Sequence, residues 1–218
     1  MSAPRLYVDS ADVDRVGALL TAGVVHGVTT NPTILERGGR TAAEIPELYA
    51  RWVGEGAGEV FFQAWGGDAA SFRRSADGLL ALGDRVAVKV PATREGFAAA
   101  SGLVRDGATV LVTAVYSVAQ ALTCASIGVR YIAPYLGRMR DAGMDGDALV
   151  ARMQGVCVDS ATDVLAASLR SPDDIVALRE AGVPYFTAAP DVIEQMLLND
   201  VSDSSAAEFD AAMVRLGA

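Results

Sequence analysis

The residue best suited to covalent chemistry is Lys89, the single lysine among the 18 basic residues of this 218-residue chain. Valine flanks it on both sides, so we expect its amine to be buried. Burial lowers the pKa of a lysine from about 10.4, so more of its amine is neutral near pH 7. A neutral amine can form a Schiff base with a ketone. A structural ion pair, for example with Asp9, is the alternative. A reactive lysine is favoured, because all other basic residues are arginine, which suits fixed ion pairs better.

Few other side chains could transfer protons or bind a metal. The one histidine, His26, stands at the start of an apolar run, where we expect a structural role. Tyr135 follows another apolar run, and its hydroxyl makes it the candidate for acid–base chemistry. Cys124 and Cys157 are too few for a zinc site or a disulfide framework, and carboxylates do not cluster with the histidine. We therefore expect no metal and no cofactor.

Eight short apolar runs, each followed by a helix-like stretch, would have to position these side chains. This alternation is typical of βα units that build a parallel sheet, and eight units without a break in composition predict a single (β/α)₈ barrel over residues 1–218. An open doubly wound sheet is the runner-up, although no Gly-x-Gly-x-x-Gly motif follows the first run. The runs cover residues 6–8, 24–28, 60–62, 86–90, 110–112, 129–133, 164–167 and 183–186.

Charge and hydropathy exclude several classes of protein. The formal net charge is −9 and the pI is about 4.6, which argues against nucleic-acid and anionic-membrane partners. The longest uncharged run, 107–129, carries six Ser, Thr and Gln residues and fits a strand followed by a helix better than a membrane span. No signal peptide is visible at the start of the chain, so we expect a cytoplasmic protein.

Polar residues close the apolar runs, where a barrel of this kind carries its active site. A single such residue has an ordinary explanation as a loop residue or a helix cap. The whole set is harder to dismiss, because all of its members would face one mouth. We therefore predict that the site contains Asp9, Thr29, Asn31, Gln63, Lys89, Thr113, Ala133, Tyr135, Arg138 and Ser168.

Several of these residues stand in motifs that resemble the small transaldolase family, in particular its fructose-6-phosphate aldolase branch. The resemblance covers almost the whole chain. It rests on Leu-Tyr-Val-Asp at 6–9, Gly-Val-Thr-Thr-Asn-Pro-Thr at 27–33, Val-Lys-Val-Pro-Ala-Thr at 88–93, Thr-Ala-Val-Tyr at 113–116, Tyr-Ile-Ala-Pro-Tyr at 131–135 and Leu-Ala-Ala-Ser at 165–168.

The resemblance implies roles for individual residues. Lys89 would form the Schiff base with a ketose donor such as dihydroxyacetone or a ketose phosphate. Asp9 and Asn31 would hold donor hydroxyls, and Thr113 would position the donor or the catalytic water. Arg138 and Ser168 would bind the phosphate or distal oxygen of the aldehyde part.

The resemblance also separates two activities and implies an assembly. Tyr135 and Gln63 match the aldolase branch, in which they could orient a water that shuttles protons; true transaldolases tend to have Phe and Glu at these positions. Trp65 departs from the family pattern, and near the mouth it would reshape the acceptor side of the site. Family members often form pentamers or pairs of pentamers, so a homo-oligomer is expected, with a C-terminal helical segment from about residue 204 packed on a neighbouring subunit.

Three functions remain open at this point. The leading hypothesis is a cofactor-free class I aldolase that cleaves a ketose phosphate reversibly through a Lys89 imine. The second is a transaldolase that moves a dihydroxyacetone unit between sugar phosphates on the same lysine. The third is a barrel that binds a sugar phosphate without catalysis, and Lys89 tied up in an ion pair would support it.

Overall fold

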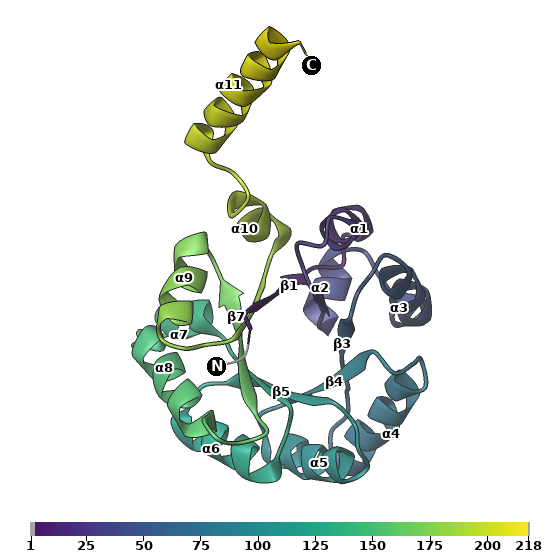
Figure 1. Ribbon diagram of the computed structural model, residues 1–218. Coiled ribbons are helices and arrows are strands. Elements are labelled where there is room, and N and C mark those ends of the chain that lie inside the picture. Colours follow the sequence, from purple (N-terminus) through teal and green to yellow (C-terminus); the bar gives the residue numbers. More distant parts are fainter. Residues whose placement is uncertain (1–2, 218) are drawn as a thin grey trace.

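The computed structural model describes residues 3–217 and contains a closed barrel of eight parallel strands (Figure 1). Each strand pairs with the next along the chain, and the last pairs with the first, so the sheet has no free edge. This closure confirms the predicted (β/α)₈ barrel and excludes the open sheet. The strands are β1 (Arg5–Asp9), β2 (Gly27–Thr29), β3 (Glu59–Gln63), β4 (Val86–Pro91), β5 (Val110–Val115), β6 (Tyr131–Pro134), β7 (Asp163–Leu169) and β8 (Tyr185–Ala188).

Helices form a ring outside the strands (Figure 1). Their starts follow ordinary capping chemistry: Ser171, for example, accepts a hydrogen bond from the Asp174 amide, and Pro172 occupies the first helical position. The helical elements are α1 (Val13–Thr21), α2 (Pro32–Arg37), η1 (Ala42–Glu44), α3 (Ile45–Gly54), α4 (Ala69–Leu80), α5 (Arg94–Arg105), α6 (Val118–Ile127), α7 (Leu136–Asp141), α8 (Gly146–Cys157), α9 (Pro172–Glu180), α10 (Pro190–Gln195) and α11 (Asp200–Leu216).

Alternation along the strands divides the apolar side chains between two cores. One core fills the space between the strands and the helices, and a smaller one fills the barrel interior. Ala87 belongs to the interior core, so Lys89, two residues further along β4, faces the same way nearer the carboxyl end. The strand period thus points the one lysine into the barrel mouth.

A polar network closes the opposite, amino-terminal end of the barrel. The Glu59 carboxylate accepts hydrogen bonds from the Tyr7 hydroxyl at 2.6 Å and from the Tyr131 hydroxyl at 2.9 Å. His26 lies at this end, 3.2 Å from an Arg5 guanidinium nitrogen and 3.8 Å from a Glu59 oxygen. The predicted placement of His26 away from the mouth is therefore confirmed.

Some expected boundaries shift in the structure. The apolar runs at 24–28 and 183–186 predict strands that start at residues 24 and 183, whereas β2 starts at Gly27 and β8 at Tyr185. Backbone pairing, which hydropathy does not report, decides where a strand begins. The uncharged run at 107–129 contains β5 and α6, as predicted. Among the described residues, no helix is long and apolar enough to cross a membrane.

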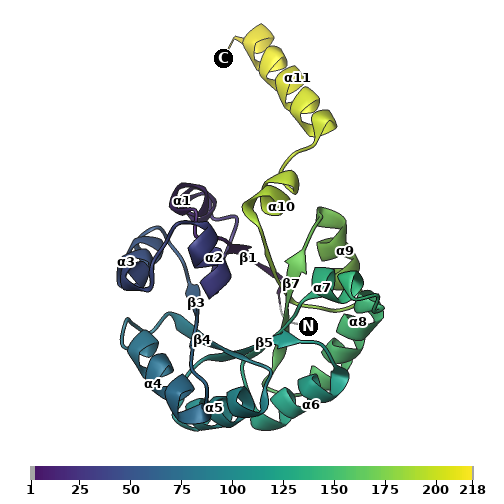
Figure 2. The same ribbon diagram turned by 180° about the vertical axis from the view of Figure 1, so that it is seen from behind.

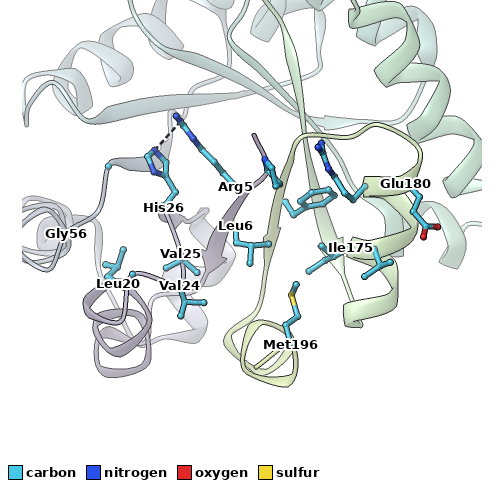
Figure 3. Close-up of a pocket in the computed structure, with 16 residues that line it drawn as sticks. Arg5, Leu6, Leu20, Val24, Val25, His26, Gly56, Ile175, Glu180 and Met196 are labelled. Atoms are coloured by element: carbon cyan, nitrogen blue, oxygen red, sulfur yellow. Dashed lines mark hydrogen bonds between the residues drawn. The ribbon is translucent and has the colours of Figure 1, made fainter. Parts of the chain in front are cut away.

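The C-terminal helix leaves the barrel. α11 begins at Asp200, four residues before the expected start at 204, and both views show it projecting away from the ring beyond the short α10 (Figures 1 and 2). An apolar cavity of about 720 Å³ lies beside α10, between α1 and α9 (Figure 3). Its lining includes Leu6, Leu20, Val24, Ile175 and Met196. Since α10 has six residues, the last position of the helical ring is only partly covered.

Candidate active site

Lys89 forms the floor of a polar cavity of about 300 Å³ at the carboxyl ends of the strands. Its side chain is buried, and Nζ donates a hydrogen bond to the Thr30 carbonyl oxygen at 2.6 Å. Burial lowers the pKa of Lys89, and the charge of Asp9 only partly opposes this effect. Within residues 3–217, no carboxylate oxygen lies within 4.0 Å of Nζ, so the lysine is not held in an ion pair.

Asp9 and Thr29 form one wall of this cavity. Thr29 Oγ1 lies 2.5 Å from Asp9 Oδ1, to which it donates, and 2.7 Å from Thr187 Oγ1 on β8. Desolvation raises the pKa of Asp9, while the charges of Lys89 and Arg138 and the Thr29 hydroxyl pull it down. The hydroxyl chain fixes the orientation of a carboxylate that lies close enough to the lysine to affect its charge.

Tyr135 occupies the opposite wall, where β6 passes into α7. Its hydroxyl lies 2.6 Å from Thr113 Oγ1, and the Arg138 guanidinium stacks 4.9 Å from the centre of its ring. Burial raises the pKa of Tyr135, so the hydroxyl is protonated at neutral pH and can donate a proton or a hydrogen bond. Thr113 is buried in β5, two residues before its end, and fixes the direction of this hydroxyl.

A cationic rim borders the outer part of the cavity. Ser168 has a positive φ of 58°, and the register between β7 and β8 shifts around it, so a bulge redirects its side chain. Arg170 and Ser168 both lie against Gly137 of α7: a Cβ built there would be 2.7 Å from Arg170 Nε and 2.9 Å from Ser168 Oγ. Glycine at this position lets the hydroxyl and the guanidinium approach the helix that carries Arg138.

Asn31 and Gln63 differ in their relation to the cavity. Asn31 caps α2 by accepting from the Ile34 amide at 3.0 Å, and it lines the cavity beside Asp9. Gln63 is paired in register with Lys89, but it lines an adjoining cavity of about 360 Å³ together with Trp65. Its side-chain amide donates to the Ala64 carbonyl oxygen at 3.2 Å.

The structure brings most of the predicted site together. Asp9, Thr29, Asn31, Lys89, Ala133, Tyr135, Arg138 and Ser168 line one cavity, Thr113 contacts it through Tyr135, and Gln63 lies beside it. Sequence reasoning missed several lining residues. Thr187 could have been found as the polar residue of the last strand, whereas the others belong to helices, to strands or, for Arg170, to the loop after β7. The missed residues are Thr33, Ile34, Arg37, Leu111, Asp141, Leu165, Ala167, Arg170 and Thr187.

The donor set determines the chemistry that this site can do. It offers one buried amine, one carboxylate, hydroxyls on both walls and arginines at the rim. In the part of the chain that the structure describes, no three His, Cys, Asp or Glu side chains are grouped so that they could hold a metal ion. Fold and site together define a (β/α)₈ barrel with a buried lysine at the carboxyl ends of the strands and arginines at the rim of its cavity.

Comparison with known proteins identifies the family. A family model described as "Transaldolase/Fructose-6-phosphate aldolase" matches residues 6–217, and the chain belongs to this family. A relative named "Probable transaldolase" from Chelativorans sp. is 32% identical over 98% of both chains. Another of that name from Cereibacter sphaeroides is 34% identical over 98% of this chain and 97% of the relative. These relatives indicate that the chain is an enzyme.

Solved structures with the same fold are more distant in sequence. A thiamine phosphate pyrophosphorylase from Pyrococcus furiosus aligns with a TM-score of 0.61 and 15% identity over 87% of each chain. A putative dihydrodipicolinate synthase family protein from Coccidioides immitis aligns with a TM-score of 0.66 and 14% identity, over 97% of this chain and 75% of the other. At these identities, the likeness extends to the barrel fold alone.

Proposed function

We propose that this chain is a class I aldolase that cleaves and forms a ketose phosphate through a Schiff base on Lys89. The observation that carries the proposal is the position of the lysine: its amine is buried at the catalytic end of the barrel and is free of ion pairing among residues 3–217. A buried amine with a lowered pKa is the nucleophile that imine chemistry needs. The same observation speaks against a purely binding barrel, in which the lysine would be tied to a carboxylate.

The reaction follows from the arrangement of the groups. The Lys89 amine adds to the ketone carbonyl, and loss of water gives a protonated imine. A base then removes the proton of the hydroxyl on the fourth carbon, the bond between the third and fourth carbons breaks, and its electrons move into the imine to give an enamine. The aldehyde leaves, the enamine takes up a proton at carbon, and water releases dihydroxyacetone.

Residues on the two walls would share the proton transfers. Asp9, beside the lysine, would transfer protons at the carbinolamine. Together with Asn31 and Thr29 it would also hold a donor hydroxyl. Tyr135, oriented by Thr113, would bind the water that shuttles protons on the opposite wall. Gln63 would assist that water from the adjoining cavity.

The rim suits a phosphorylated substrate. Arg138 and Ser168 lie outside the lysine floor, where the distal end of a ketose bound at Lys89 would extend. The small side chain of Ala133 also lines this cavity. A dianionic phosphate at this rim would have the Arg138 guanidinium and the Ser168 hydroxyl as donors.

A transaldolase is the second candidate, and the printed names of the relatives favour it. The two activities differ in the fate of the three-carbon unit. Purified enzyme would be given fructose 6-phosphate with and without an acceptor aldehyde, and free dihydroxyacetone would be measured, with Lys89→Met as the inactive control. Ketone release without an acceptor supports the aldolase. Release that depends on the acceptor, with transfer to it, supports the transaldolase.

We also propose that the functional protein is a homo-oligomer, a pentamer or decamer, in which α11 packs on a neighbouring subunit. Large apolar side chains of this helix are exposed, among them Val201, Phe209, Met213 and Leu216. The partly covered position beside α10 exposes an apolar cavity on the barrel (Figure 3). Each chain has one apolar helix without a packing partner and one open apolar surface. If α11 of one copy packed on this surface of another, both would be buried.

A further inference from the structure

The charges around the outer rim of the Lys89 cavity are not all available to a ligand. Three arginines line the rim: Arg37 at the end of α2, Arg138 in α7 and Arg170 after β7. Arg37 and Arg138 have no carboxylate within 4.0 Å among residues 3–217. Arg170, in contrast, is held by Asp141 through two hydrogen bonds, one of them 2.9 Å from Nη1 to Oδ1. Asp141 is itself part of the cavity lining.

Asp141 occupies a position that disfavours a carboxylate. It is the last residue of α7, where the partial negative charge of the helix end repels an anion. Its partner Arg170 compensates this repulsion and lowers the pKa of Asp141. The pair is solvated, since the two side chains are 55% and 58% exposed, and exposed pairs of this kind contribute little stability and exchange easily.

The neighbours of Arg170 define where it would bind an anion. Its Nε lies against Gly137, next to the Ser168 hydroxyl, and Arg138 follows Gly137 in the same helix. The donors of Ser168, Arg138 and Arg170 therefore converge on one side of the rim, and the Asp141 carboxylate occupies part of the guanidinium fork that a phosphate would use.

We propose that Asp141 is a specificity-determining residue that holds Arg170 in the empty enzyme and yields it to a phosphate dianion. A ligand with two negative charges can displace one carboxylate from the guanidinium, whereas a monoanion meets a competitor of equal charge. Asp141 would thus make the rim selective for phosphorylated over carboxylated aldehydes. This inference rests on the proposed function for the identity of the substrate, but the ion exchange itself does not depend on catalysis.

The test measures anion binding directly. Inorganic phosphate and acetate would be titrated into the wild-type enzyme, into Asp141→Asn and into Arg170→Met by calorimetry at low salt. Asp141→Asn is expected to bind phosphate about two- to fivefold more tightly, the range that an exposed pair of this strength can supply, and to gain proportionally more for acetate. Arg170→Met is expected to lose phosphate affinity. High salt is expected to shrink both effects.

A matched control separates this role from a general change in charge. Asp106 caps the C-terminus of α5 and pairs with Arg73 on the surface, away from the cavity. Asp106→Asn removes the same charge and should leave both affinities unchanged. Phosphate binding that is weaker or unchanged in Asp141→Asn, or absent from all variants, would overturn the proposal. Dihydroxyacetone carries no phosphate, so its trapping on Lys89 does not involve the rim. This trapping therefore tests the proposed function separately from anion binding.

Discussion

At the scale of single residues, the apolar setting of Lys89 determines its protonation. Burial lowers the pKa of its amine below the ordinary value of 10.5, so the neutral form exists at a lower pH than in a solvated lysine. We predict that the rate of borohydride-trapped adduct formation with dihydroxyacetone rises with pH and reaches a plateau below pH 10.5. The rate is measured by intact mass at a series of pH values. An inflection at or above 10.5 would contradict a desolvated amine.

The same shift makes a prediction about stability. Because the folded-state pKa of Lys89 is lowered, the unfolded chain binds more protons between the two pKa values, and stability rises with pH through that window. As the pH increases toward 10.5, the free energy of unfolding of the wild-type enzyme should therefore increase relative to that of Lys89→Met. Urea unfolding of both proteins at several pH values measures it. A difference in free energy of unfolding that does not change with pH would contradict the lowered pKa of Lys89.

Tyr135 should control how the three-carbon unit leaves. Its protonated hydroxyl, fixed by Thr113 at 2.6 Å, is the acid–base group of the opposite wall in the proposed reaction. We predict that Tyr135→Phe lowers the release of free dihydroxyacetone by about 10²- to 10⁴-fold, while imine formation at Lys89 persists. Product release and trapped adduct are measured on the same preparation. Loss of both in a folded variant would mean that the tyrosine acts before the imine or shapes the cavity.

At the scale of elements, the close packing of α7 against the end of β7 depends on one glycine, Gly137. A Cβ at Gly137 would lie 2.7 Å from Arg170 Nε and 2.7 Å from the Ser168 carbonyl oxygen, so Gly137→Ala must move the rim. We expect a loss of about 1–3 kcal/mol in the free energy of unfolding and a higher KM for phosphorylated substrate. Denaturant unfolding and kinetics measure the two effects.

Gly155 provides the matched control for this prediction. It lies in α8, where no neighbouring atom is within 4 Å of a built Cβ. Gly155→Ala should therefore stabilise the protein by about 0.5–1 kcal/mol, because alanine is the better helix former, and should leave KM unchanged. If Gly137→Ala behaved in the same way, the close contact between α7 and β7 would be irrelevant.

The elements also explain which parts of the site could be predicted from sequence. Strand ends converge at the mouth of any closed parallel barrel, so Asp9, Thr29 and Lys89 follow from the pattern of apolar runs. Arg170 and Asp141 do not, because their approach depends on the bulge at Ser168 and on the packing of α7. Strand alternation places Gln63 on the same side of β3 as Phe61, toward the barrel interior, yet Gln63 lines the adjoining cavity with Trp65. Alternation along the strand therefore does not predict the surroundings of this last strand residue.

At the scale of the whole molecule, α11 is the element whose placement the barrel alone does not explain. It projects away from the ring (Figure 2). The side chains of its Phe209 and Met213 are exposed. We predict that the double substitution Phe209→Asp and Met213→Asp reduces the number of subunits, because charge on this face would oppose burial against another copy. Light scattering after size exclusion measures the assembly. A wild-type monomer, or an unchanged assembly in the variant, would contradict exchange of α11.

The account depends above all on Lys89 acting as a nucleophile. The direct measurement is to incubate the enzyme with dihydroxyacetone or fructose 6-phosphate, add borohydride, and record the intact mass and a peptide map. Since the chain has a single lysine, a stable adduct can form only there or at the N-terminus, and the map separates the two. We predict one adduct on Lys89, absent from Lys89→Met. No adduct with any of several ketoses, in a folded wild-type enzyme, would contradict Schiff-base catalysis.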